Sequence, residues 1–230
     1  MRQFPVMLFA AGFGTRMGVL TRDRPKPLIP VAGRCLLDHA LALVEGAAMQ
    51  RSVVNAHYHA GQIAAHVAER RVAVSVEDPI LDTGGGLRAA LPLLGGNPVI
   101  TLNTDAVWTG LNPLVELAAA WDDHMSGLLL LAPLAQTAGF DGTGDFLLTP
   151  DGRIARAAGR PGLAYLGAQI IRTDMLADVA EQAFSLNLLW DRMIAAGRAY
   201  GIVHQGRWCD VGRPEGIALA EAMLAQSGDG

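Results

Sequence analysis

Short apolar runs of strand length alternate with longer amphipathic stretches through the first 133 residues of this 230-residue chain. The runs are rich in Val, Leu and Ile, which predicts buried strands at Pro5–Ala10, Arg51–Asn55, Val72–Glu77, Pro98–Asn103 and Gly127–Ala132. Apolar residues at helical spacing predict helices over Leu36–Met49, Gly61–Arg70, Leu87–Leu94 and Leu111–His124. The alternation favours an α/β fold, with a Rossmann-like, mostly parallel mixed sheet between helices on both faces, in three αβα layers.

The regular alternation of predicted strands and helices ends after Pro133. A Gly- and Asp-rich stretch and a turn signal precede a further predicted strand over Leu163–Arg172. Two helices are expected next, starting from Thr173 and near Asn187, and then a strand over Tyr200–His204 and a final helix after Arg213-Pro214. No repeat or low-complexity linker interrupts the chain, so residues 1–230 are expected to form a single domain.

Composition excludes several classes of protein. Hydrophobic residues make up 51% and charged residues 17%, which is incompatible with an intrinsically disordered chain. No apolar run approaches the 18 or so residues of a membrane span, and no secretory leader is visible, so a cytoplasmic protein is expected. A net charge of −4 gives no reason to expect nucleic-acid binding. Cys35 and Cys209 lack CxxC spacing and suggest neither a disulfide framework nor a zinc site.

Glycines follow the first predicted strand directly, in the segment Gly12-Phe13-Gly14-Thr15-Arg16. Glycine lets backbone N–H groups approach a phosphate closely. The segment is not a P-loop, because no Gly-Lys-Ser/Thr follows at the required spacing. It is not a Rossmann fingerprint either, because the third glycine of GxGxxG comes one residue late and the expected acidic residue is missing.

Two cations accompany this glycine segment. Arg16 lies within it, and Lys26 follows ten residues later between Pro25 and Pro27, which stiffen the backbone. A guanidinium that binds bidentately and an ammonium that acts as a point charge together suit a polyphosphate. A solvated loop with two surface cations remains the alternative at this stage.

The glycine segment belongs to a longer ordered set of motifs. Its members are Ala10–Met17, Leu20-Thr21, Pro25–Leu28, Pro30-Val31, Gly33, Asp82–Gly86, Leu102–Asp105, Tyr165–Gly167 and Trp208–Pro214. In identity, order and spacing they resemble the signature of the sugar-1-phosphate nucleotidyltransferases over nearly the whole chain. The resemblance implies the nucleotidyltransferase fold, with a nucleotide-binding half over about 1–133 and a small sugar-side lobe over about 134–226.

Within that family, the segments Thr83–Gly86 and Gly144–Phe146 and the residues Asn103, Asp105 and Trp108 most resemble the N-acetylmuramate-1-phosphate uridylyltransferases. The implied reaction is attack of a sugar 1-phosphate on the α-phosphorus of a nucleoside triphosphate, with release of pyrophosphate. UTP and N-acetylmuramate 1-phosphate are the favoured substrates. A phosphate monoester is mostly ionised at neutral pH, so no general base is needed, and positioning and charge neutralisation remain for the protein to supply.

The same resemblance assigns roles to residues that are distant in the sequence. Asp105 and Asp210 would hold Mg²⁺, a hard cation that takes carboxylate and phosphate oxygens. Arg16 and Lys26 would hold phosphates as the catalytic groups. The nucleotide would be bound by Ala11, Gly12, Gly14, Thr15, Glu77, Thr83, Gly84 and Asn103, and the sugar by Asp145, Tyr165 and Gly167.

Two residues depart from the family pattern. Glu77 stands where relatives often carry Gln, and since a carboxylate only accepts hydrogen bonds, the identity of the base stays open. Thr104 stands where Gly is usual, which is expected to bring a side chain close to the ribose. The alternatives are dTTP or GTP with a hexose 1-phosphate, CTP with an amino-alcohol phosphate, or a catalytically silent relative that binds a nucleotide sugar. The oligomeric state also stays open.

The histidines give no signal of a further site. His57 and His59 lie near a strand end without a third ligand, and are expected to be exposed or hydrogen-bonded. His66 and His124 fall on predicted helices and are expected to face solvent. The sequence therefore predicts a single metal site, at the two aspartates.

Overall fold

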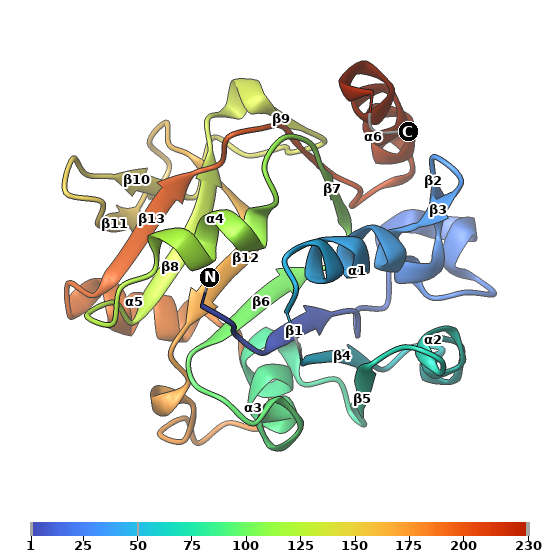
Figure 1. Cartoon of the computed structure of the whole chain (residues 1–230), viewed down its shortest axis with the longest axis horizontal. Helices are drawn as coiled ribbons and strands as arrows, with labels where there is room; N and C mark the ends of the chain where they lie inside the picture. The colour runs from blue at the N-terminus through green and yellow to red at the C-terminus, as the bar shows by residue number, and fades with distance from the viewer. Residues whose placement is uncertain (1, 50, 229–230) are drawn as a thin grey trace.

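The computed structural model describes residues 2–49 and 51–228. A seven-stranded sheet in the order β13-β8-β12-β6-β1-β4-β5 forms its centre, as Figure 1 shows. Its strands are β1 (Val6–Phe9), β4 (Ser52–Ala56), β5 (Val72–Val76), β6 (Val99–Asn103), β8 (Gly127–Ala132), β12 (Ala164–Ile171) and β13 (Ala199–Val203). All neighbouring strands run parallel except at β12, which is antiparallel to both β6 and β8. The predicted mostly parallel mixed sheet is confirmed.

Helices cover both faces of this sheet, because alternate residues of each strand point to opposite sides. On one face, Val6 and Leu8 pack with α1 (Leu36–Gly46), α2 (Ala60–Val67) and α4 (Pro113–Ala120). Figure 1 shows α1 and α4 over the near face. On the other face, Met7 packs with α3 (Asp82–Leu94) and α5 (Asn187–Ala195). No helix among the described residues is long and apolar enough to cross a membrane.

Smaller sheets extend from the carboxyl ends of the central strands. β7 (Ala106–Trp108) and β9 (Thr137–Ala138) flank β14 (Trp208–Asp210) in a three-stranded sheet. The final helix α6 (Pro214–Ser227) packs on it through a separate apolar cluster that includes Val107, Cys209 and Met223. Two hairpins complete the strands: β2 (Pro30–Val31) with β3 (Arg34–Cys35), and β10 (Phe146–Leu148) with β11 (Ile154–Arg156).

The strands of the central sheet agree with the sequence prediction to within about one residue at each end. The helix predicted from Thr173 is wrong, because only a 3₁₀ turn over Asp174–Leu176 forms there. Thr173 makes no side-chain cap, and its own backbone N–H is taken by the side chain of Asn97 at 3.0 Å. The final helix expected after Arg213-Pro214 is present as α6, which ends at Ser227.

The other notable difference is at α3, which begins five residues earlier than predicted. Three glycines of low helix propensity, at 84–86, suggest a loop from sequence but form the first turns of this helix. They are buried, and the N–H groups of Gly84 and Gly85 both donate to the carbonyl of Phe184, at 2.8 and 3.1 Å. Tertiary contact with the segment 182–184 therefore overrides the local preference for a loop.

Candidate active site

The glycine segment after β1 turns sharply and leads into a 3₁₀ helix over Thr15–Thr21. Gly14 has a left-handed backbone (φ 65°), and a Cβ there would lie 2.9 Å from Thr21 Cγ2 and 3.0 Å from Lys26 Cβ. The Thr21 hydroxyl donates to the carbonyls of Gly14 and Gly18, both at 3.1 Å. Only glycine fits at position 14, and the turn brings the segment carrying Arg16 and Thr15 against Lys26. Arg16 and Thr15 are both exposed on it.

Lys26 is the only lysine in the chain; every other permanent cation is an arginine. Lys26 is only 8% exposed, and its Nζ lies 2.7 Å from Asp105 Oδ2. Prolines on both sides place it in a 3₁₀ turn over Lys26–Leu28, so the side chain has little freedom. A compact ammonium in a buried slot next to a carboxylate is thus a fixed part of the fold.

Asp105 follows β6, at the edge of the sheet where the parallel strands end. Its neighbour Thr104 is buried and turns inward, donating from Oγ1 to the carbonyl of Phe9 at 2.7 Å. Thr104 does not line the cavity that Asp105 borders. The hydroxyl anchors the end of β6 to β1 instead, because a buried hydroxyl must find an acceptor.

Asp210 is brought beside Asp105 by the antiparallel pairing of β7 with β14, in which Asp210 is opposite Ala106. The backbone N–H of Val211 donates to the carbonyl of Asp105 at 2.8 Å. Burial, and then the nearby Asp105 carboxylate, raise the pKa of Asp210 to about 6, against the opposing effect of Lys26 and Arg16. Two carboxylates 105 residues apart in the sequence thus share one electrostatic environment.

Arg16 reaches the same place from the 3₁₀ helix. A Cβ added at Gly212 would lie 2.7 Å from Asp210 Oδ2 and 3.3 Å from both terminal nitrogens of Arg16. The absence of a side chain at 212 therefore lets a guanidinium and a carboxylate approach the same point. The structure thus brings together all four charged residues singled out from the sequence: Arg16, Lys26, Asp105 and Asp210.

A cavity of about 230 Å³ lies beside these charges, at the carboxyl ends of β1, β4 and β6. Its lining combines backbone of the glycine segment with side chains from three other segments. The lining residues are Phe9, Ala11, Gly12, Asn55, Glu77, Ile80, Asp82, Thr83, Asn103 and Asp105. Five of the eight residues assigned to the nucleotide thus border it, namely Ala11, Gly12, Glu77, Thr83 and Asn103.

Glu77 is 2% exposed, and internal donors occupy both of its oxygens. Oε1 accepts from Asn55 Nδ2 at 2.7 Å, and Oε2 accepts from the backbone N–H of Leu81 at 2.9 Å. Asn55 Oδ1 in turn accepts from the N–H of Ala10 at 2.6 Å. This chain of hydrogen bonds ties the two walls of the cavity together, so Glu77 holds the walls in place.

Thr83 lines the cavity and accepts from the N–H of Leu186 at 3.0 Å, whereas Gly84 faces away from it. A Cβ on Gly84 would collide with the ring of Phe184. Gly84 therefore serves close packing of α3 against the segment 182–184. Asp82, two residues before Gly84, has a left-handed backbone (φ 59°) that few non-glycine residues adopt.

The three residues expected on the sugar side come from the second half of the chain. Asp145 Oδ2 accepts from the backbone N–H of Tyr165 at 2.8 Å. The Tyr165 ring stacks edge-on against Trp190, with 4.9 Å between ring centroids. Gly167 lies in a bulge of β12 with φ 75°, and a Cβ there would lie 2.8 Å from the Asn103 amide. This segment therefore abuts the cavity through Asn103.

The sequence analysis did not single out Asn55 and Phe9, or the individual residues Ile80 and Asp82, as lining residues. Asn55 could have been found, because it is a polar residue at the carboxyl end of a predicted central strand, where ligands of open α/β sheets collect. Asp82 belongs to the motif Asp82–Gly86, but no role of its own was assigned to it. Its place follows from the helical course of the three glycines behind it.

Comparison with known proteins identifies the family. The MobA-like NTP transferase domain matches residues 6–140. The chain is 41% identical to an N-acetylmuramate alpha-1-phosphate uridylyltransferase of Caulobacter vibrioides, over 96% of this chain and 97% of that protein. It is 31% identical to the protein of that name from Neisseria meningitidis, over 94% and 96% of the two chains.

The fold recurs in a solved structure, HddC from Yersinia pseudotuberculosis complexed with GMP-PN. The TM-score is 0.77 at 22% identity, and the superposition covers 96% of this chain and 99% of that one. The arrangement of the sheet is therefore shared beyond recognisable sequence similarity. With the domain match and the two full-length relatives, these findings show that the chain is an enzyme of the nucleotidyltransferase family built on the MobA-like NTP transferase domain.

Proposed function

We propose that this enzyme transfers a uridylyl group from UTP to N-acetylmuramate 1-phosphate and releases pyrophosphate, with Mg²⁺ as its metal. The observation that carries the proposal is the Lys26–Asp105 pair beside Asp210, at one border of the 230 Å³ cavity. The sugar and the base are those in the name of the 41% identical relative, which covers nearly the whole chain.

The donor set fits a hard divalent cation. Asp105 and Asp210 offer only carboxylate oxygens, and the pKa of Asp210 is raised first by burial and then by repulsion from Asp105, both of which a bound cation would offset. The positive charges of Lys26 and Arg16 only partly compensate the negative charge of the two aspartates. When bound, Mg²⁺ supplies positive charge to the phosphates of the reacting substrates. In this proposal Asp105 and Asp210 are its ligands.

Lys26 and Arg16 divide the work on the phosphates. Of the three N–H donors of the Lys26 ammonium, one is committed to Asp105 and two remain for phosphate oxygens. Lys26 therefore neutralises charge where the two substrates meet, at the α-phosphate. Arg16, exposed on the 3₁₀ helix and near Asp210, holds the outer phosphates that leave as pyrophosphate. The attacking phosphate needs no base, since it is already ionised.

The cavity would take the uracil. Backbone of Ala11 and Gly12 forms one wall, and the segment from Glu77 to Thr83 forms the other. Because both Glu77 oxygens already accept internal hydrogen bonds, its role is to fix the spacing of these walls. A base is then read chiefly by backbone groups, whose positions Glu77 and Asn55 set.

Pyrophosphate release with a panel of triphosphates (UTP, dTTP, GTP and CTP) and phosphate acceptors tests the proposal. We expect the highest kcat/KM with UTP and N-acetylmuramate 1-phosphate, and loss of turnover on removal of Mg²⁺ or in Asp105→Ala. Asp122→Asn, an exposed aspartate beside His124, is the control and keeps full activity. A preference for dTTP, GTP or CTP would reassign the substrates. Tight nucleotide-sugar binding by calorimetry without turnover would identify a silent relative.

A further inference from the structure

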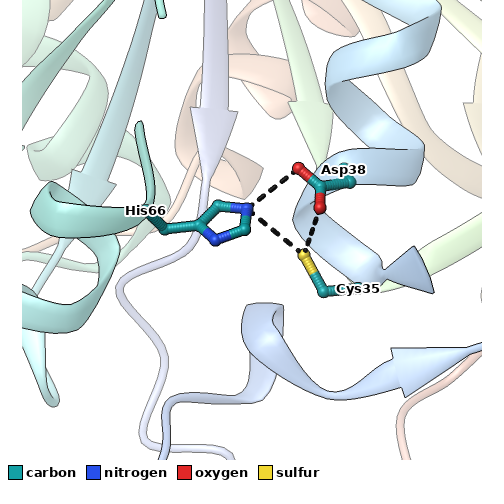
Figure 2. A group of neighbouring side chains, drawn as sticks. All are labelled: Cys35, Asp38 and His66. Atoms are coloured by element: carbon teal, nitrogen blue, oxygen red, sulfur yellow. Dashed lines mark hydrogen bonds and ion pairs between the residues drawn. The ribbon is translucent and has the colours of Figure 1, made fainter. Parts of the chain in front are cut away.

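Three side chains of different chemistry meet on α1 and α2, in a cluster that the proposed reaction does not use. Cys35 is the N-cap residue of α1 and Asp38 lies in its first turn, whereas His66 lies in the last turn of α2. Figure 2 shows all three pointing toward one another. Cys35 Sγ lies 3.1 Å from Asp38 Oδ2 and 3.5 Å from His66 Nε2, and His66 Nε2 lies 2.9 Å from Asp38 Oδ1.

This arrangement corrects a sequence expectation. His66 is turned toward α1, and its side chain is 29% exposed, whereas that of Asp38 is 18% exposed. The cluster is thus partly buried but open enough for an ion to enter. It is also the sole group of three or more His, Cys, Asp or Glu side chains that meets the spacing of a metal site among residues 2–49 and 51–228.

We propose that Cys35, Asp38 and His66 form a second metal site, which binds a zinc-class divalent cation. Thiolate, imidazole and carboxylate are the three ligand types that Zn²⁺ takes in proteins. With ordinary Zn–S, Zn–N and Zn–O bonds, tetrahedral ligands lie about 3.3–3.6 Å apart. The separation of 3.5 Å between Sγ and Nε2 already matches, and that of 3.1 Å between Sγ and Asp38 Oδ2 needs to widen by only a few tenths of an ångström. Nε2 contacts the other oxygen, Oδ1, and gives up that contact when it turns to the metal.

The charges and protons balance when a cation enters. The Cys35 thiol gives its proton to the buffer, and its sulfur forms the bond to the metal. Without metal, His66 Nε2 carries the ring proton and donates it to Asp38 Oδ1. On metal binding this proton moves to Nδ1 through solvent, and the freed Nε2 lone pair coordinates. One thiolate and one carboxylate then neutralise a divalent cation, and solvent takes the fourth position.

Arg70 is the one permanent cation in contact with the cluster among the described residues, with Nη2 2.6 Å from Asp38 Oδ1. It opposes cation binding by its charge. It contacts Oδ1, however, whereas Oδ2 faces the sulfur, so one oxygen can serve the metal while the other keeps Arg70. Such an outer hydrogen bond orients a ligating carboxylate.

A cation here would clamp two elements that flank the segment leading to Lys26. Leu36, at the start of α1, donates to the carbonyl of Ile29 at 3.0 Å. At the other end, Gln62 of α2 donates to the carbonyl of Asp23 at 2.9 Å. The proposed site therefore joins both supports of the segment 23–29, and its occupancy is expected to raise thermal stability without any substrate.

Cobalt(II) substitution tests the proposal directly, because a thiolate bound to Co²⁺ gives a charge-transfer band in the near ultraviolet, whereas the two active-site aspartates cannot. We expect this band in the wild-type protein at one equivalent and its displacement by Zn²⁺. It should persist in Asp105→Asn and in Cys209→Ser, the matched control for the chain's other cysteine. It should be absent in Cys35→Ser, which keeps a hydroxyl donor for Asp38.

The affinity for Zn²⁺ should fall at least about 100-fold in Cys35→Ser and in His66→Gln, as measured by competition with a chromogenic chelator. Thermal unfolding without metal checks that both variants still fold. Absence of the band, or a band that follows Cys209, would overturn the proposal and leave the cluster as a hydrogen-bonded brace. Neither readout involves turnover, so failure here is separate from failure of the uridylyltransferase assignment.

Discussion

Lys26 donates to Asp105, with 2.7 Å between Nζ and Oδ2, although 79 residues separate the two in the sequence. The ion pair is part-buried and lies next to a second carboxylate, Asp210, whose pKa is raised to about 6. In this partly buried set of two carboxylates and one ammonium, removing Lys26 or Asp105 breaks the ion pair, whereas removing the charge of Asp210 leaves the pair intact.

Replacing the chain's only lysine tests this set. Lys26→Met is expected to lower kcat by about 10²–10³, because charge at the α-phosphate then lacks its nearest fixed donor. Lys26→Arg is expected to fail almost as badly, since a planar guanidinium does not fit a slot built for a compact ammonium. Steady-state pyrophosphate release measures both. Recovery of most activity in Lys26→Arg would contradict the argument for a point charge.

Asp210→Asn is expected to stabilise the metal-free protein while abolishing turnover. The pKa of Asp210 rises from 3.8 to about 6 in the folded chain, so its ionised form opposes folding at neutral pH. The variant should gain on the order of 1–3 kcal/mol at pH 8 in chelator, measured by urea unfolding.

The sign of this effect fixes its pH dependence. As the pH falls through about 6 the wild-type carboxylate protonates, so the advantage of Asp210→Asn shrinks and is gone below about 4. Asp105→Asn is the matched control and should show no gain, because it strips Lys26 of its partner. Equal stability of wild type and Asp210→Asn at pH 8 would refute the energetic cost of the buried Asp210 carboxylate beside Asp105.

Gly86→Ala is expected to destabilise the protein by about 2–4 kcal/mol. A Cβ at this helical position would collide with Glu77 Oε1 and come within 3.0 Å of Asn55 Nδ2, which breaks the hydrogen bonds joining the cavity walls. Gly61→Ala, in α2 with nothing within 4 Å of the added Cβ, should instead stabilise by about 0.5–1 kcal/mol. Chemical denaturation of the two variants measures both; similar values for them would refute the steric argument.

Tyr165 gives a pH signal at the alkaline end. Burial, and the Asp145 carboxylate, raise its pKa well above the ordinary 10. Above about pH 10 the phenol ionises in the unfolded chain but stays protonated in the folded chain. The folded protein therefore loses stability as the pH rises above about 10.

Absorbance of tyrosinate measures this difference. Tyr165→Phe should leave the native titration unchanged below about pH 11, yet reduce the amplitude in denaturant by a third, since the chain has three tyrosines. If the folded Tyr165→Phe variant gave less tyrosinate absorbance than the folded wild type, by the amount of one tyrosine, Tyr165 would ionise in the folded state and the prediction would be wrong.

Local patterns were sufficient for the central sheet. Strands such as β8 (Gly127–Ala132) are short, apolar on both faces and bounded by turns, and their residues are buried whatever their neighbours. Local patterns were not sufficient where the helix preference of the residues is weak. The three glycines at 84–86 are helical because Phe184 and Glu77 pack where side chains would stand. His66 was misjudged for the same reason, because its partners lie on another helix.

The sequence by itself determined the α/β class, the family, and which charged residues were candidates for chemistry: Arg16, Lys26, Asp105 and Asp210. These follow from short-range periodicity and from motifs in a fixed order, both of which can be read directly along the sequence. Only the tertiary structure decided that the pairing of β14 with β7 carries Asp210 to Asp105, that Glu77 spans the cavity walls, and that His66 meets Cys35. Such contacts depend on strand register and helix packing, which act across distant parts of the chain and leave no local trace in it.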